Sequence, residues 1–346
     1  MGSTGHPART GAAAPYDPAM RFSSKTVGLA SAVVTVLIWS GFIVIARASA
    51  SRGLLPMDIA LARILGASAV LLPWAWWLLR PARQAGEQVG SLWGLSPLPL
   101  RQTVQTGLLG GFLYAILAYT GFFYAPASHA SVLMPGSLPL WTTLLAWLFL
   151  REKVAAARAV GLGFIVLGDV LVGGASLLMA FDGGEVWKGD LLFMVAALCW
   201  ASYSVLVRSQ GFDAVRATMA ITAFAFVCFV PLFALLVALQ VLPTQLHQAP
   251  WSEILFQAVF QGVGSVVISG ITFTQMLRHY GAVRSTMITA LVPGLSALGA
   301  VWFLGEPMHW NLLAGLALVT SGILFGVRQA KKPVVASTSP PTGGQA

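Results

Sequence analysis

Residues 149–172, FLREKVAAARAVGLGFIVLGDVLV, are matched at a constant offset of 154 by residues 303–326, FLGEPMHWNLLAGLALVTSGILFG. The same offset pairs Glu152 with Glu306, Gly161 with Gly315, Gly168 with Gly322 and, further upstream, Pro139 with Pro293. Glycine and leucine recur in any apolar stretch, whereas proline and glutamate do not, so the Pro and Glu matches carry most weight. The sequence therefore contains an internal repeat.

A second match extends the repeat toward the start of each copy. WSGFIVIAR, which begins at Trp39, aligns with WASYSVLVR, which begins at Trp200. The two stretches also end on the same residue type, and this pairs Arg47 with Arg208. The chain is thus predicted to consist of two related halves.

The composition indicates a protein whose surroundings are mostly lipid. Hydrophobic residues make up 57% of the 346 residues and charged residues only 9%, with a mean hydropathy of +0.80. A soluble domain has about 25% charged residues. The net charge of +9 comes from basic residues in short segments between apolar runs. This distribution is typical of a charge bias across a membrane and argues against nucleic-acid binding.

Ten segments are long and apolar enough to cross a bilayer as helices. They are predicted at 27–46, 57–79, 104–124, 127–149, 156–178, 189–207, 218–240, 253–275, 282–304 and 309–327. Five spans in each half would insert the second half upside down relative to the first. The predicted fold class is therefore an all-α integral membrane protein with ten transmembrane helices in two inverted five-helix repeats.

The predicted organisation has five parts. They are a disordered cytoplasmic leader (1–26), the first repeat (27–178), a periplasmic linker (179–188), the second repeat (189–327) and a disordered basic cytoplasmic tail (328–346). With the N-terminus inside, 16 of the 20 Lys and Arg residues fall on the cytoplasmic side. The positive-inside rule therefore predicts that both termini are cytoplasmic, in the inner membrane of a bacterium.

The sequence resembles the drug/metabolite transporter superfamily, and within it the EamA family of bacterial permeases. The resemblance rests on Trp39-Ser40-Gly41, Arg63, the run TGFFYAPASHASVLMPGSLPLWTTLLAWLFLREK from Thr120, the run LRHYGAVRSTMITALVPGLSALGAVWFLGEP from Leu277, and the glycines Gly315 and Gly322. It covers roughly residues 27–327. It implies a transporter of amino acids or other metabolites, working as an exporter, and names no substrate. Asp169 departs from the family pattern, which has an apolar residue there.

No catalytic pattern is present in the sequence. It has neither GxxxxGK[ST] nor HExxH, and its two cysteines, Cys199 and Cys228, lie in different apolar segments. We therefore predict no enzyme activity, no cofactor and no metal site.

Polar side chains recur along the eighth predicted span. Gln257, Gln261, Ser265 and Ser269 are spaced four residues apart and would share one helix face, which lipid would not tolerate. This stripe is predicted to face the interior of the bundle. There it would form either a wall of the substrate path or interhelical hydrogen bonds.

Prolines recur at equivalent positions in the fourth and ninth predicted spans. Pro139 shares a face with Ser131, and Pro293 shares a face with Thr289. Proline frees a backbone carbonyl one turn earlier, and such groups need a partner inside a membrane. The pair would give bends that flank a central site, or static kinks that only shape the packing.

Polar aromatic residues within the spans are further candidates for substrate contact. They are Trp39, Tyr114, Tyr119, Trp200 and Tyr203. Ordinary packing in the core is the alternative interpretation of all five.

Two charged residues lie at similar predicted depths. Arg63 and Asp169 are therefore expected to form an ion pair, and an unpaired Asp169 would instead be a candidate for proton coupling. His129 is expected at the outer interface. Glu152 and Glu306 are expected to hold loops or helix ends against basic partners.

These features favour a secondary carrier of small polar metabolites that works by alternating access, and the family resemblance alone implies that it exports them. The alternatives are a passive facilitator of the same architecture, an importer of a small neutral metabolite, and a membrane enzyme or assembly factor. The expected partners are a small-molecule substrate, the lipid bilayer and protons as coupling ion. Close packing at Gly161 and Gly168 would also allow a homodimer.

Overall fold

The computed structural model describes residues 24–50, 52–85 and 90–328. Most of the predicted leader and tail lies outside these residues. The first half contributes α1 (Ser24–Ser49), α2 (Pro56–Leu78), α3 (Arg80–Gln84), η1 (Leu92–Gly94), α4 (Leu100–Gly107), η2 (Leu108–Leu113), α5 (Tyr114–Tyr124), α6 (Ala127–Leu133), α7 (Leu138–Leu150), α8 (Ala156–Met179) and η3 (Ala180–Asp182). The second half contributes α9 (Val186–Ser209), α10 (Ala214–Ala238), α11 (Trp251–Gln257), η4 (Ala258–Ile268), α12 (Ser269–Thr289), α13 (Val292–Leu304) and α14 (Trp310–Arg328).

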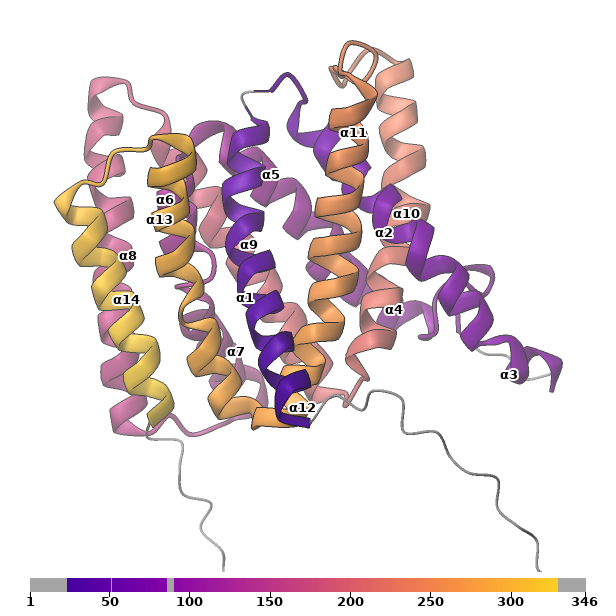
Figure 1. Cartoon of the computed structure of the whole chain (residues 1–346), viewed down its shortest axis with the longest axis horizontal. Coiled ribbons are helices and arrows are strands. Elements are labelled where there is room, and N and C mark those ends of the chain that lie inside the picture. Colours follow the sequence, from indigo (N-terminus) through magenta and orange to yellow (C-terminus); the bar gives the residue numbers. More distant parts are fainter. Residues whose placement is uncertain (1–23, 51, 86–89, 329–346) are drawn as a thin grey trace, which may run out of the picture.

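The helices confirm the predicted fold class. Within the described residues, nine helical stretches are long and apolar enough to cross a membrane, and a tenth, shorter apolar stretch covers Trp310–Gly326. The ends of the predicted spans differ from these stretches by at most five residues. The long helices run side by side, and α1 begins at the same end of the bundle at which α14 finishes (Figure 1). The chain therefore crosses an even number of times.

The largest difference from the sequence prediction falls between the eighth and ninth spans. There the helical segment α12 runs from the eighth span into the ninth and reverses direction within itself, as the hydrogen bond from the Ser285 hydroxyl to the carbonyl of Met276, nine residues earlier, shows. In the first half, the corresponding turn separates α5 from α6. Pro126 stands in the first turn and Tyr280 at the equivalent position of the second. Proline cannot continue a helix and tyrosine can, which accounts for the difference.

Contacts between the helices follow the inverted repeat. The first span of each half packs on the third span of the other, so that α1 lies against α12 and α9 against α5. The second spans do the same, with α2 against η4 and α10 against η2 and α4. Such reciprocal contacts are expected of two halves related by a two-fold axis in the membrane plane.

The last span of each half packs on its counterpart along a seam of glycines. A Cβ atom on Gly161 would lie 2.6 Å from the carbonyl oxygen of Gly322, and one on Gly168 would lie 2.7 Å from that of Gly315. These four glycines are the repeat-related set, and their absent side chains let α8 and α14 approach closely. The glycine contact is thus made within the chain, so these residues are covered and do not supply a surface for a dimer.

Candidate functional site

Two irregular helical segments occupy equivalent places in the two halves. The third span contains the π-helical η2, and the eighth span contains the π-helical η4. π-helical turns are rare and frequently mark functional sites. Each segment packs on the second span of the opposite half, and Gly262 of η4 approaches α2 so closely that a Cβ there would lie 2.7 Å from the carbonyl oxygen of Arg63. Nothing in the sequence pattern had indicated π winding.

The fourth and ninth spans are interrupted at equivalent places. The fourth span breaks between Leu133 and Leu138, and the ninth breaks between Thr289 and Val292. Pro139 and Pro293 lie in the first turn of the segments that follow these breaks. Proline is well tolerated in a first turn, since the amide there has no partner within the helix. The two prolines therefore mark interruptions of the spans rather than bends within continuous helices.

Arg63 is the centre of a polar cluster between the two halves. Its Nη1 atom donates to the backbone carbonyl of Gln261 at 3.2 Å and to the hydroxyl of Ser265 at 3.1 Å. Its guanidinium carbon lies 5.5 Å from the centre of the Phe42 ring, which in turn packs edge-on against Tyr119 at 6.0 Å. Arg63 on α2 thus contacts η4 directly and α5 through the Phe42 ring of α1, so that polar groups of both repeats meet here.

Tyr119 and Gln261 each bring an unused polar group to this cluster. The Tyr119 side chain is 1% exposed, and its hydroxyl interacts electrostatically with Arg63 but has no hydrogen-bond partner of good geometry. The Gln261 amide is fully buried, and neither its nitrogen nor its oxygen has a partner. Buried polar groups without partners are uncommon and call for an explanation.

The ion pair expected between Arg63 and Asp169 is wrong for this structure. Arg63 bonds to η4, whereas both carboxylate oxygens of Asp169 are buried without a hydrogen-bond partner. Asp169 belongs to α8, which pairs with α14 at one edge of the bundle, while α2 lies on the other side of α1 (Figure 1). The prediction used only the depth of each residue within its span, and two residues at equal depth are close together only if their helices are neighbours.

The remaining residues of the polar stripe have structural partners. Gln257 is fully buried and donates to the Ser49 hydroxyl at 2.6 Å and to Glu253 at 2.7 Å, which links α11 to the end of α1. Ser269 donates back to the carbonyl of Ser265 at 2.8 Å. The stripe thus faces the interior, and part of it forms interhelical hydrogen bonds.

The mid-span aromatic residues pack on the opposite half. Trp39 lies 5.1 Å from the ring of Phe273, and its repeat counterpart Trp200 lies 5.0 Å from Tyr114 and 5.2 Å from Tyr203. Both tryptophans therefore pack, with tilted rings, across the boundary between the halves. Their packing leaves substrate contact as an open prediction.

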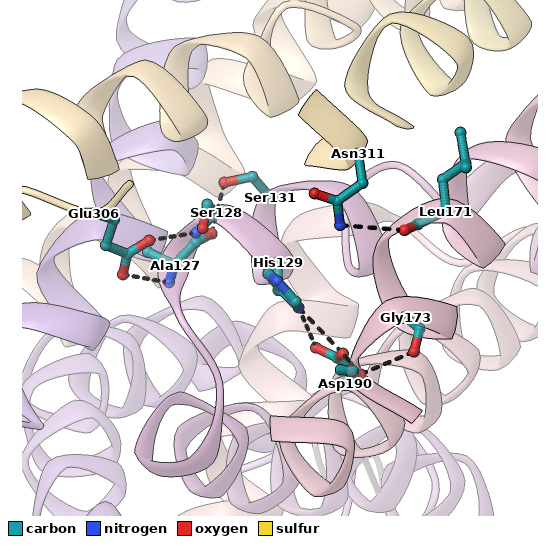
Figure 2. Close-up of polar contacts among 10 residues, drawn as sticks. Ala127, Ser128, His129, Ser131, Leu171, Gly173, Asp190, Glu306 and Asn311 are labelled. Carbon is teal, nitrogen blue, oxygen red and sulfur yellow. Dashed lines mark hydrogen bonds and ion pairs between the residues drawn. The ribbon is translucent and has the colours of Figure 1, made fainter. Parts of the chain in front are cut away.

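Glu306 joins several elements at the end of the bundle where α6 begins. Its carboxylate accepts from the amides of Ala127 at 2.8 Å and Ser128 at 2.9 Å, so it caps α6 (Figure 2). The same carboxylate lies 3.7 Å from Nε of Arg47. At the other end, Glu152 forms an ion pair with Arg208 at 2.7 Å. Both glutamates thus have the basic partners and the anchoring role expected from the sequence.

Sequence reasoning missed a second polar group near Glu306. His129 Nδ1 lies 2.9 Å from Asp190, and the same carboxylate accepts from Ser176, so that α6, α8 and α9 are joined (Figure 2). Ser131 lies one turn from Ala127 and donates to its carbonyl at 2.8 Å. The sequence signal for this pair is an aspartate near the start of the sixth span and a histidine near the start of the fourth. Both are polar groups close to the same end of the bundle.

No group of three or more His, Cys, Asp or Glu side chains suited to a metal ion occurs among the described residues. The interior instead offers a guanidinium, hydroxyls and amides between two inverted halves. A polar interior of this kind, within ten membrane-crossing helices, defines a membrane transporter.

Comparison with known proteins identifies the family. The model of the EamA-like transporter family matches residues 26–174 and again residues 187–328. The chain belongs to this family, with one copy in each half.

Similar proteins come from bacteria, archaea and plants. An uncharacterized transporter of Archaeoglobus fulgidus is 25% identical over 299 residues, 86% of this chain and 96% of that protein. The uncharacterized transporter YyaM of Bacillus subtilis is 24% identical over 221 residues, 63% of this chain and 70% of that protein. The WAT1-related protein At5g40210 of Arabidopsis thaliana is 23% identical and covers 88% of this chain and 89% of its own. A solved crystal structure at 22% identity covers 90% of this chain and all of its own, with a TM-score of 0.54, and shares the fold.

Proposed function

We propose that this protein is a secondary active transporter that exports small polar metabolites, amino acids or related compounds, by alternating access. The observation that carries the proposal is the pairing of irregular segments: π-helical turns in the third and eighth spans and interruptions in the fourth and ninth. Irregular backbone inside a membrane is tolerated where it lines a cavity or is buried in protein. Its occurrence at equivalent places in inverted halves is typical of carriers whose halves exchange arrangements.

The two ends of the bundle support alternation because they use equivalent residues differently. At one end, Arg47 and Glu306 are 33% and 11% exposed, and Glu306 also caps α6. At the other end, their counterparts Arg208 and Glu152 are 51% and 48% exposed. We infer that the structure represents the state with the Glu306 end closed, and that transport exchanges the two arrangements.

The orientation proposed here follows the basic residues. Both ends of the chain would lie in the cytoplasm of a bacterial cell, the turn after α8 would lie in the periplasm, and the Glu306 end would face outward. Export is proposed from the family resemblance, and protons are proposed as the coupling ion because Asp169 has an unpartnered carboxylate inside the bundle.

A metabolite screen tests this function. Medium and cell extracts would be compared between a strain that overproduces the protein and one that carries the empty vector. We expect at least one polar metabolite to accumulate outside only on overproduction. Proteoliposomes loaded with that compound should then show counterflow. A passive facilitator would equilibrate the compound without counterflow, and an importer would deplete it from the medium.

A further inference from the structure

Arg63 is a cation inside the bundle without an acidic partner. It lies seven residues from Pro56 at the start of α2, about 10 Å along the helix at 1.5 Å per residue. In the described part of the chain, the carboxylates that form ion pairs do so with Arg47, Arg52, His129, Lys188 and Arg208, and none with Arg63. A charge inside a membrane protein is costly unless it is paired, and such residues commonly mark the substrate pathway.

The guanidinium has donors to spare. The two hydrogen bonds of good geometry come from Nη1, and their acceptors, a carbonyl and a hydroxyl, are neutral. The Tyr119 hydroxyl, which also interacts with the guanidinium, is neutral as well. Arginine carries five N–H donors in a rigid fork that fits two acceptor oxygens side by side. The Nη2 and Nε edge is therefore the part suited to a carboxylate.

The neighbouring groups without partners fit the same ligand. The Tyr119 hydroxyl and the Gln261 amide group are both buried and can both donate. Leaving such groups unpaired costs free energy that a bound acceptor would recover. A carboxylate bound to Arg63 could thus also accept hydrogen bonds from the Tyr119 hydroxyl and the Gln261 amide.

We propose that Arg63 binds the carboxylate of the transported molecule, with Tyr119 and Gln261 as additional hydrogen-bond donors. This inference rests on the proposed transport function and specifies its substrate class. Arg63 belongs to the first half and Gln261 to the second, so a ligand bound here would contact both of the halves that must rearrange. One positive charge with neutral donors balances a singly charged carboxylate, whereas a phosphate dianion would require further cations.

Thermal unfolding of the purified full-length chain in lipid nanodiscs tests the proposal. The probes are the proteinogenic L-amino acids and simple monocarboxylates such as acetate and lactate, each beside its carboxamide. We expect at least one carboxylate to raise the unfolding temperature and its carboxamide to leave it unchanged. Arg63→Gln should weaken the binding of that carboxylate about 10-fold or more, because it removes a hydrogen-bonded charge pair.

Further variants separate binding from folding. Arg63→Lys keeps the charge but loses the planar fork, so intermediate affinity is expected. Tyr119→Phe removes only the hydroxyl and should weaken binding a few-fold while the chain remains monodisperse. Arg216→Gln, which removes an exposed arginine at the start of α10, is the matched control and should bind as the unaltered chain does.

The outcomes distinguish this inference from the proposed function. The carboxylate site is overturned if no carboxylate in the panel stabilises the protein, if acid and carboxamide stabilise it equally, or if Arg63→Gln preserves the difference. A chain that exports only uncharged or cationic compounds would keep its transport function and lose the carboxylate site. A chain that binds carboxylates through Arg63 and shows neither accumulation nor counterflow would lose the transport function alone.

Discussion

At the scale of single residues, the interior contains a cation and an anion that do not meet. Arg63 makes its contacts on η4, and Asp169 is 7% exposed with both carboxylate oxygens unpartnered. Asp169 directly follows Gly168, whose neighbour Val319 also contacts Gly136 in the interruption of the fourth span. Gain or loss of a proton by Asp169 would change the charge of a buried group, which is costly without a partner.

Asp169→Asn tests this placement. The amide is close in size to the carboxyl group and cannot ionise, so counterflow of the exported metabolite should persist while uptake driven by an imposed pH gradient falls about tenfold or more. The unfolding temperature should not fall, because the change removes an ionisable group that has no partner. Asp182→Asn, in the exposed turn after α8, is the control. Unchanged pH-driven uptake in Asp169→Asn would contradict the coupling role.

At the scale of helices, close packing and interruptions each have a residue cause. The glycine seam follows from four glycines at repeat-related positions, and each interrupted span resumes with a proline, Pro139 or Pro293, in the first turn of the next helix. The paired prolines therefore allowed the irregularity of the fourth and ninth spans to be predicted from the sequence. It did not predict the π winding of η2 and η4, because no residue type specifies an i→i+5 hydrogen bond and the winding arises from packing on the opposite half. The Arg63–Asp169 prediction was wrong for a similar reason, since depth within a span does not determine its neighbours.

Gly168→Ala tests the seam. The added Cβ would lie 2.7 Å from a backbone oxygen of α14, which cannot move aside as a flexible side chain can, so we expect destabilisation of about 1–3 kcal/mol. Gly163→Ala is the matched control on the same helix, because its Cβ would meet nothing within 4 Å and alanine favours a helix. Thermal unfolding in nanodiscs measures both. Equal unfolding temperatures would show that α8 and α14 are not held at this distance.

Glu306→Ala tests the proposed closure of the Glu306 end. It removes the cap of α6, which contributes about 0.5–2 kcal/mol, together with the contact to Arg47, so this end should open more often. Distances between spin labels at the exposed Tyr124 and Trp310, in a chain without native cysteines, should lengthen. Glu152→Ala should leave that distance as it is or shorten it. Identical distance distributions in both variants would contradict the closure.

At the scale of the whole molecule, the ten spans and their two inverted halves were predictable because hydropathy and the repeat are both properties of the chain itself. The reciprocal contacts of α1 with α12 and α9 with α5 follow from the same symmetry. The residues that form the site could not be predicted from hydropathy and the repeat, because they depend on which faces of neighbouring helices turn toward one another.

Reporter fusions test the orientation. Alkaline phosphatase fused within the turn at Gly183 should be active, and a fluorescent protein fused at the C-terminus should fluoresce, since the former matures only in the periplasm and the latter in the cytoplasm. As a control, immunoblots of the membrane fraction should show similar amounts of the two fusion proteins. An active phosphatase at the C-terminus would contradict the even number of crossings.

The glycine seam between α8 and α14 also has a meaning for how such a chain can be assembled. A single five-helix unit made alone would leave its glycine-lined backbone facing lipid, whereas here that surface is covered by the equivalent helix of a unit inserted in the opposite sense. Two separately synthesised units would therefore need to enter the bilayer in both senses in equal numbers. Joining them in one polypeptide guarantees that stoichiometry, and it frees each unit to evolve a fixed direction of insertion.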